Sequence, residues 1–349
     1  MTNFVGTIPR KLFGTLTAFA HADYALTPFN HASSYESHSP IQARAFENQV
    51  STSRITWPAT HRMRTLKSLN VIGCGRVGTT LAALLHRHGV CEVQDLYSAT
   101  LKTAQKTARF VDAGTVAARI SDMRPADVWM LSVPDSQVAS VGGELSEHAL
   151  SFPRPSTAFH CSGFLPASTL KPLQALGWQT ASVHPVFNFA DPERCVSQFK
   201  GTPCGLEGDE RAVLLLRGLL TDIGGDCFSV PTGSKPLYHA AAVFSSNFMA
   251  VLQAIAQEGW RAAGVPEALI PRIHESLLRG SVENLLAMGP AKAITGPAAR
   301  GDTAVVSTQG ALVSQWHPEA GEIYREMSVL ARRLSTTGST ASPTKANAV

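Results

Sequence analysis

The sequence has little charge and few aromatic residues, and it lacks long apolar runs. Charged residues make up 16% and aromatic residues 7% of the 349 positions. No stretch approaches the ~18–20 uninterrupted apolar residues of a membrane span, so we expect no membrane contact. Lys and Arg are scattered and the net charge is only +4, which argues against nucleic-acid binding.

Cysteine is also sparse. The six cysteines include no C-x-x-C pair, which excludes a zinc ribbon or a thioredoxin motif, and we expect no metal site. A disulfide scaffold is implausible at this length, because hydrophobic residues, 44% of the total, are enough to form a large core. We therefore predict a reducing, cytoplasmic location.

Changes in composition divide the chain into four stretches. Residues 1–65 are rich in Ser, Thr, His, Ala and Pro without a helix or strand period. They are predicted to be a disordered extension, or sequence upstream of a working start at Met63. Residues 66–232 alternate strand and helix patterns, whereas residues 233–334 are helical throughout. Residues 335–349 form a polar tail that we expect to be disordered.

The stretch 66–232 is typical of an α/β domain. A short apolar strand is predicted at Leu69–Ile72, followed by a helix at Thr79–His88. The near-continuous apolar run Asp127–Val133 is typical of a buried parallel strand. Repetition of strand and helix predicts a Rossmann-type parallel sheet with right-handed crossovers.

The helical stretch begins with two long predicted helices, Lys235–Ala263 and Pro266–Met288. Small residues lie on one face of the first helix. Because long helices with such faces rarely cover themselves, we predict a homodimer formed through the helical domains.

A G-x-G-x-x-G motif follows the first strand and opens the first helix. Gly73 permits the tight turn, Gly75 lets the backbone approach a pyrophosphate, and Gly78 allows close packing of helix and strand. The helix N-terminus supplies N–H donors and a positive dipole. Arg76 and Val77 lie in the same turn, and Arg76 offers a further phosphate contact. The motif predicts a dinucleotide cofactor.

The end of the second strand indicates which dinucleotide binds. NAD-binding domains place an acidic residue ~20 positions after the glycines, where this chain has Ser98, followed by Thr100 and Lys102. Hydroxyls and a lysine suit a 2′-phosphate, so NADP is favoured over NAD. Asp95 lies inside the strand, where its carboxylate is not expected to reach the ribose. N-capping of the next helix explains Ser98 and Thr100 equally well.

A second group of polar residues begins at Lys235. Lys235 and His239 are four residues apart and share one helix face, and Asn247 lies about three turns beyond Lys235 near the same side. A desolvated lysine beside a cofactor is suited to act as a general acid, because burial lowers its pKa. A solvated lysine and a packing histidine are the alternative interpretation.

From about residue 66 to 334 the sequence resembles a Rossmann-like family whose C-terminal half is domain of unknown function 2520, in the 6-phosphogluconate dehydrogenase-like superfamily. Six blocks carry the resemblance: Val71–Gly78, Leu131–Asp135, His160–Gly163, Val183–Pro185, Lys235–Asn247 and Gly296–Asp302. It implies an all-α C-terminal domain like that of 6-phosphogluconate dehydrogenase. It also implies cofactor contacts at Val133 and Pro134, at the end of the predicted strand Asp127–Val133.

The resemblance further implies an NADP-dependent reductase, as in ketopantoate reductase, β-hydroxyacid dehydrogenases and pyrroline-5-carboxylate reductase. In the hydroxyacid enzymes a K-x-x-x-N pair on the first interdomain helix handles the substrate. Lys235 and His239 match this spacing with His in place of Asn. The substrate of the hydroxyacid enzymes therefore cannot be assigned to this chain from the resemblance. Ser162 and Gly163 match the superfamily's Ser/Gly substrate loop and offer a hydroxyl and a backbone N–H.

Two further blocks suggest substrate contacts. His160 and His184 each end a strand at the carboxyl edge of the sheet, where ligands bind in open α/β folds. Arg300 and Asp302 lie in a loop between helices, where Arg300 could grip a substrate carboxylate. The alternative is a structural ion pair, with Asp302 capping the next helix.

The leading functional hypothesis is an NADP-dependent oxidoreductase that transfers hydride to a small 2-oxo acid or a cyclic imino acid. A ketopantoate-type substrate comes first and a Δ1-pyrroline carboxylate second. Lys235 would protonate the product with help from His239, while Ser162 and Asn247 orient the substrate. The alternative is a non-catalytic dinucleotide sensor or partner module, which needs no ionisable pair facing the nicotinamide.

Overall fold

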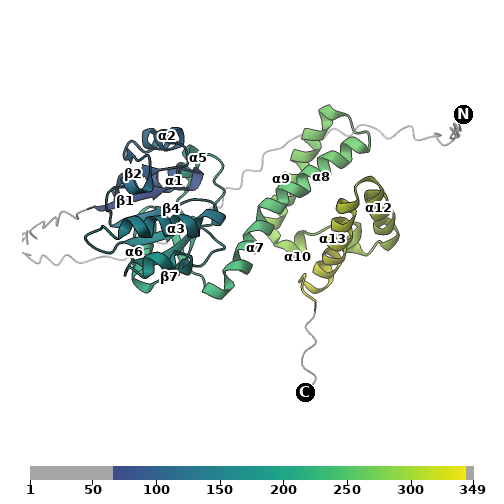
Figure 1. The fold of residues 1–349 in the computed structure, drawn as a ribbon. Coiled ribbons are helices and arrows are strands. Elements are labelled where there is room, and N and C mark those ends of the chain that lie inside the picture. Colours follow the sequence, from purple (N-terminus) through teal and green to yellow (C-terminus); the bar gives the residue numbers. More distant parts are fainter. Residues whose placement is uncertain (1–65, 343–349) are drawn as a thin grey trace, which may run out of the picture. The chain divides into compact units, whose positions relative to one another are not determined.

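The computed structural model describes residues 66–342. The extension predicted at 1–65 and the end of the predicted tail, 343–349, lie outside the described residues. Within 66–342 a sheet with flanking helices is followed by a series of helices (Figure 1). This order confirms the predicted fold class.

The first region contains an eight-stranded sheet with the order β3-β2-β1-β4-β5-β6-β7-β8. Neighbouring strands from β3 to β6 pair in parallel, and the order reverses beside β1. The strands are β1 (Lys67–Ile72), β2 (Cys91–Tyr97), β3 (Thr115–Val116), β4 (Val128–Leu131), β5 (Thr157–His160), β6 (Gln179–Pro185), β7 (Pro203–Gly208) and β8 (Asp226–Ser229).

Strand β7 departs from the predicted all-parallel sheet, because it runs antiparallel to β6 and parallel to β8. Between β6 and β7 the chain forms only the short helix α5 (Pro192–Gln198), so it turns back instead of crossing over the sheet. The reversal places Ser182 of β6 directly opposite Glu207 of β7. A carboxylate thereby comes close to the ends of β5 and β6.

Helices bury both faces of the sheet in two separate cores. On one side α1 (Arg76–Arg87) and α6 (Glu210–Asp222) contribute Leu81 and Leu216. On the other side α3 (Asp135–Ala149) and α4 (Lys171–Gln174) contribute Val138 and Leu173, while α2 (Leu101–Val111) follows β2. The sequence pattern does not predict α3, because its Gly142-Gly143 pair weakens the helical signal.

The second region is helical, with one interruption that the sequence pattern does not predict. Ser246, at φ −128° and ψ −65°, leaves helical geometry and divides the expected helix Lys235–Ala263 into two. The last helix extends to Thr337 and ends at the left-handed Gly338, so the tail begins later than the predicted residue 335. The helices are α7 (Lys235–Ser245), α8 (Asn247–Ala262), α9 (Ile270–Met288), α10 (Pro290–Ala293), α11 (Pro297–Arg300), α12 (Thr303–Trp316) and α13 (Pro318–Thr337).

The helical region leaves much apolar surface uncovered in a single chain. Neither α8 nor α12 contains a buried residue, and the side chains of Phe244, Leu286 and Leu312 are largely exposed. Contrary to our expectation, the helical stretch Thr232–Ala262 is long and apolar enough to cross a membrane by length and composition alone. It also carries His239 and Asn247, and we expect a second copy of the chain to cover its apolar face.

We therefore predict a dimer at micromolar concentration. Leu286→Glu places a charge at a side chain that is 84% exposed, so it should weaken association without unfolding the chain. Light scattering should give twice the chain mass of 37.2 kDa for the native protein and a lower mass for this variant. Leu214→Glu, on the exposed surface of α6, is the control. A monomeric native protein would contradict the prediction.

Candidate functional site

The glycine-rich turn lies between β1 and α1 at the carboxyl edge of the sheet. Gly73 has a φ of +101°, and a Cβ there would overlap the carbonyl of Ser132. A Cβ on Gly78 would in turn overlap the carbonyl of Gly73, so close packing requires glycine at both positions. Gly75 precedes α1 and has nothing within 4 Å of the position that a Cβ would take. The N-terminus of α1 is therefore open to a phosphate group.

Helix α1 begins at Arg76, three residues earlier than predicted, so Arg76 and Val77 lie in its first turn. Arg76 is exposed beside the open Gly75. Val133 and Pro134 follow β4, and the Val133 side chain lies next to Gly73. This arrangement suits a dinucleotide phosphate, and the individual cofactor contacts stay predictions.

The end of β2 leads directly into the N-terminus of α2. Thr100 is the N-cap of α2, and its Oγ1 accepts a hydrogen bond of 3.3 Å from the Thr103 N–H, so the capping interpretation is correct for this residue. Asp95 is buried, and its carboxylate accepts hydrogen bonds from Arg124 N–H and Nη2 at 2.7 and 2.6 Å. Both carboxylate oxygens of Asp95 are therefore bound to Arg124. Ser98, half-buried, stays the candidate for the 2′-phosphate.

His160, at the end of β5, is fully buried and both its ring nitrogens have partners within the chain, which does not favour the expected substrate contact. Its Nδ1 accepts a 3.3 Å hydrogen bond from the Ser162 N–H, and its Nε2 lies 3.1 Å from the Pro166 carbonyl oxygen. Burial lowers the pKa of His160, so the ring stays neutral at pH 7. The ring shapes the loop that follows β5.

Ser162 has a similar internal role. Its side chain is buried, and its Oγ accepts hydrogen bonds from the backbone N–H groups of Phe164 and Leu165 at 3.1 and 2.9 Å. The hydroxyl therefore closes its own turn. The expected role of Ser162 in orienting a substrate stays a prediction, and only the proton of its hydroxyl is left for it.

Lys235 is the most deeply enclosed charged residue of the site, with only 1% of its surface exposed. Its Nζ donates hydrogen bonds to Ser182 Oγ at 2.7 Å and to the Ser162 carbonyl oxygen at 3.3 Å. Ser182 Oγ donates onward to a carboxylate oxygen of Glu207 at 3.2 Å. Burial lowers the pKa of Lys235, opposed by the negative charges of Glu207 and Asp135. Enclosed in this way, Lys235 supports the loop after β5, and its expected role as general acid stays a prediction that this enclosure does not favour.

Three aromatic rings, those of His184, Tyr238 and His239, pack together next to this network. His184 Nδ1 is 2.8 Å from the hydroxyl oxygen of Tyr238, and the rings of His184 and His239 are 5.6 Å apart. Both histidines pack against Gly163, where a Cβ would come within 2.6 Å of His239 Cδ2. Glycine is therefore required at position 163, because a side chain there would overlap the two histidine rings. The sequence alone assigns no role to Tyr238, although it lies in one of the six blocks.

The ionisation states of His184 and Tyr238 follow from burial. Burial lowers the pKa of His184 to about 4, and the positive charges of His239 and Lys235 act in the same direction. Burial also raises the pKa of Tyr238 to about 12. At pH 7 His184 is therefore neutral and Tyr238 keeps its proton, so their contact is a hydrogen bond between neutral groups.

A hollow of about 710 Å³ opens beside these rings and is called the proximal hollow below. His184, Tyr238 and His239 line it together with Asn247. Asn247 begins α8 after the interruption, and its Oδ1 accepts a 2.7 Å hydrogen bond from Ser246 Oγ. The structure therefore brings His184, His239 and Asn247 together, although the continuous helix expected to align Asn247 with Lys235 is broken.

Arg300 and Asp302 form an exposed ion pair, with 2.9 Å between Arg300 Nη2 and Asp302 Oδ2. Neither residue lines the proximal hollow. The ion pair agrees with the structural interpretation, but Asp302 precedes α12 without making the expected side-chain capping hydrogen bond. A substrate contact of Arg300 stays a prediction.

Comparison with known families and structures agrees with this architecture. Residues 58–185 match the Rossmann-like domain family, and residues 202–330 match the domain of unknown function DUF2520. No curated protein matches the sequence.

Solved structures show the same fold. A Thermotoga maritima protein is 25% identical, with a TM-score of 0.61, and the match covers 77% of this chain and 99% of that one. A provisionally assigned NADP oxidoreductase of Bacteroides fragilis is 23% identical, with a TM-score of 0.62 and coverage of 77% and 98%. An imine reductase of Myxococcus stipitatus in complex with NADP⁺ is 17% identical, with a TM-score of 0.55 and coverage of 78% and 96%.

The two kinds of glycine in the turn should respond differently to substitution. Gly75→Val projects into open space beside the N-terminus of α1, so it should abolish NADPH binding with little change in melting temperature. Gly73→Ala should lower the melting temperature by several degrees, because its Cβ meets the Ser132 carbonyl. Calorimetric titration and thermal unfolding measure the two effects. Full NADPH affinity in Gly75→Val would contradict the assignment of this turn.

The low pKa of His184 should appear in the pH dependence of stability. As pH falls below about 6.5 the unfolded chain binds a proton that folded His184 does not take up until about pH 4. The group should therefore lower stability by up to ~1.4 kcal/mol per pH unit in that window. Urea unfolding at pH 7.5 and 5.0 measures the free energy of unfolding, which should fall less between these pH values for His184→Asn than for the native protein. The exposed His88→Asn should behave like the native protein.

Proposed function

We propose that this chain, which joins a Rossmann-like domain to a DUF2520 domain, is an NADP-dependent reductase of a small molecule with a C=N or C=O group. One observation carries the proposal. His184 of β6 and His239 of α7 pack against Gly163 in the loop after β5, and both line the proximal hollow. This loop lies on the same edge of the sheet as the glycine turn that leaves the N-terminus of α1 open. A sensor without turnover has no need of His184, Tyr238 and His239 at that position.

The lining of the proximal hollow favours an uncharged substrate centre over a 2-oxo acid. Neither Lys nor Arg is among its lining residues, so a carboxylate there would lack a cationic partner. The ketopantoate-type hypothesis depends on an accessible Lys235, and Lys235 is buried. The same argument applies to the Δ1-pyrroline carboxylate that the sequence suggests as the second substrate, because it also carries a carboxylate. A cyclic imine without a carboxylate is therefore our preferred substrate.

Bound NADPH would supply the hydride. His239 is half-buried and lines the hollow, so we assign it as the group that gives a proton to the substrate nitrogen or oxygen. His184 stays neutral, and Tyr238 fixes its ring through Nδ1, which suits it to orient the substrate by hydrogen bonding. Lys235 holds the loop on which both histidines rest.

Two substitutions separate these roles. His239→Asn should keep NADPH binding and reduce turnover by ~10²–10⁴-fold, since it removes the proton donor. Lys235→Met should instead lower the free energy of unfolding by roughly 1–3 kcal/mol, because it leaves Ser182 and the Ser162 carbonyl without their donor. Oxidation of NADPH, compared with NADH, in the presence of cyclic imines and 2-oxo acids provides the assay.

A different order of effects would change the assignment. A loss of turnover confined to Lys235→Met, with stability unchanged, would restore the lysine as the general acid. Tight NADPH binding without oxidation by any compound of the panel would favour the sensor function. A preference for NADH would refute the role of Ser98.

A further inference from the structure

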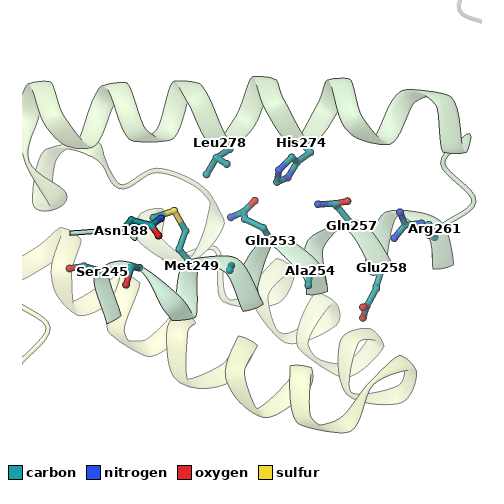
Figure 2. A pocket seen from close by; sticks show the side chains of 12 residues that line it. Asn188, Ser245, Met249, Gln253, Ala254, Gln257, Glu258, Arg261, His274 and Leu278 are labelled. Atoms are coloured by element: carbon teal, nitrogen blue, oxygen red, sulfur yellow. The ribbon is translucent and has the colours of Figure 1, made fainter. Parts of the chain in front are cut away.

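A second hollow, of about 740 Å³, lies between α8 and α9, and we call it the distal hollow (Figure 2). Its walls include Gln253 and Gln257 of α8 and His274 and Leu278 of α9. Figure 2 shows the side chains of Gln253, Gln257 and His274 in the gap between the two helices. None of these residues takes part in the proposed reduction.

The distal hollow adjoins the proximal hollow. Asn188, Ser245, Ser246 and Ala250 line both of them. The two hollows thus meet where the helix is interrupted between α7 and α8. Gln257 lies about 16 Å beyond Ser246 along α8, at ~1.5 Å per residue. A small imine beside His184 is too short to reach it.

The distal hollow offers hydrogen-bonding groups that suit a ligand. His274 Nδ1 is buried and has no hydrogen-bond partner within residues 66–342. Such atoms are rare in folded proteins, and a ligand can hydrogen-bond to one at little desolvation cost. The amides of Gln253 and Gln257 supply both donors and acceptors nearby.

The charges around the distal hollow disfavour an anionic ligand. Glu258 lines it, and Arg261, which also lines it, is bound by Glu267 with 3.0 Å between Arg261 Nε and Glu267 Oε2. A carboxylate or phosphate would therefore meet one carboxylate and no free arginine or lysine of the lining. An uncharged group such as a primary amide matches the glutamines and the histidine.

We infer that the distal hollow binds the far end of an elongated substrate, an uncharged chain bearing an amide or hydroxyl group. The reducible group of that substrate lies at His184 and His239, so the inference rests on the proposed function. The exposed apolar side chains of Phe248 and Val251 lie roughly 140–200° around α8 from Gln253, at ~100° per residue, so they face away from the hollow.

The test compares two 2-substituted 1-pyrrolines whose side chains have equal length, one ending in a primary carboxamide and the other in an isopropyl group. The full-length native protein with saturating NADPH should show a KM about 3- to 10-fold lower for the amide, as expected for one or two hydrogen bonds, with similar kcat. His274→Leu and Gln257→Leu should each bring the ratio of the two KM values towards one. Ser276→Ala, exposed on another side of α9, should preserve the ratio.

Equal KM values for the two compounds in the native protein would overturn the inference while leaving the reduction intact. A preference for the amide that survives both His274→Leu and Gln257→Leu would overturn it as well. If neither compound nor any member of the panel of cyclic imines and 2-oxo acids is reduced, the proposed function fails, and calorimetry with the NADP⁺-loaded protein decides about the distal hollow. Tighter binding of the amide compound that is lost in His274→Leu supports the hollow, and equal binding of both compounds refutes it.

Discussion

The buried ammonium group of Lys235 is the constraint on which the rest of the site depends. Removing an ammonium ion from water costs several kcal/mol unless hydrogen bonds and an opposite charge compensate. Here the Ser162 carbonyl, Ser182 Oγ and the Glu207 carboxylate behind it provide that compensation. Because these groups come from the loop after β5, from β6 and from β7, one side chain fixes three segments of the sheet to the first turn of α7.

The antiparallel strand β7 makes this arrangement possible. Its reversal pairs Glu207 with Ser182, which places the carboxylate one hydrogen bond away from the atom that Lys235 binds. Thr232 Oγ1 and the Ala167 N–H also donate to Glu207, so its buried oxygens are satisfied. The departure from an all-parallel sheet therefore has a direct role in the site, because it brings the counter-charge to the lysine.

The sequence predicts those features that depend on local spacing. The fingerprint of Gly73, Gly75 and Gly78, the strand-and-helix order and the change to an all-helical region follow from residues close together in the chain. The roles of His160 and His184 do not, since both simply end strands. Their roles depend on partners that the fold brings to them, the Ser162 N–H and the Pro166 carbonyl for His160 and the Tyr238 hydroxyl for His184. The interruption at Ser246 had a weak local signal, because Ser245, Ser246 and Asn247 are all poor helix formers.

The position of the buried lysine at the first residue of α7 has a consequence for motion between the two regions. In many two-domain proteins the connecting segment is the hinge, because few contacts cross it. Here a rotation about residues 230–234 would pull a charged group out of its enclosure and leave Glu207 uncompensated. Such a rotation is energetically disfavoured, whereas Ser246 already lies outside helical geometry. Flexing that admits a substrate is therefore expected at Ser246, beyond His239, so that α7 with Tyr238 and His239 stays fixed to the sheet while α8 moves.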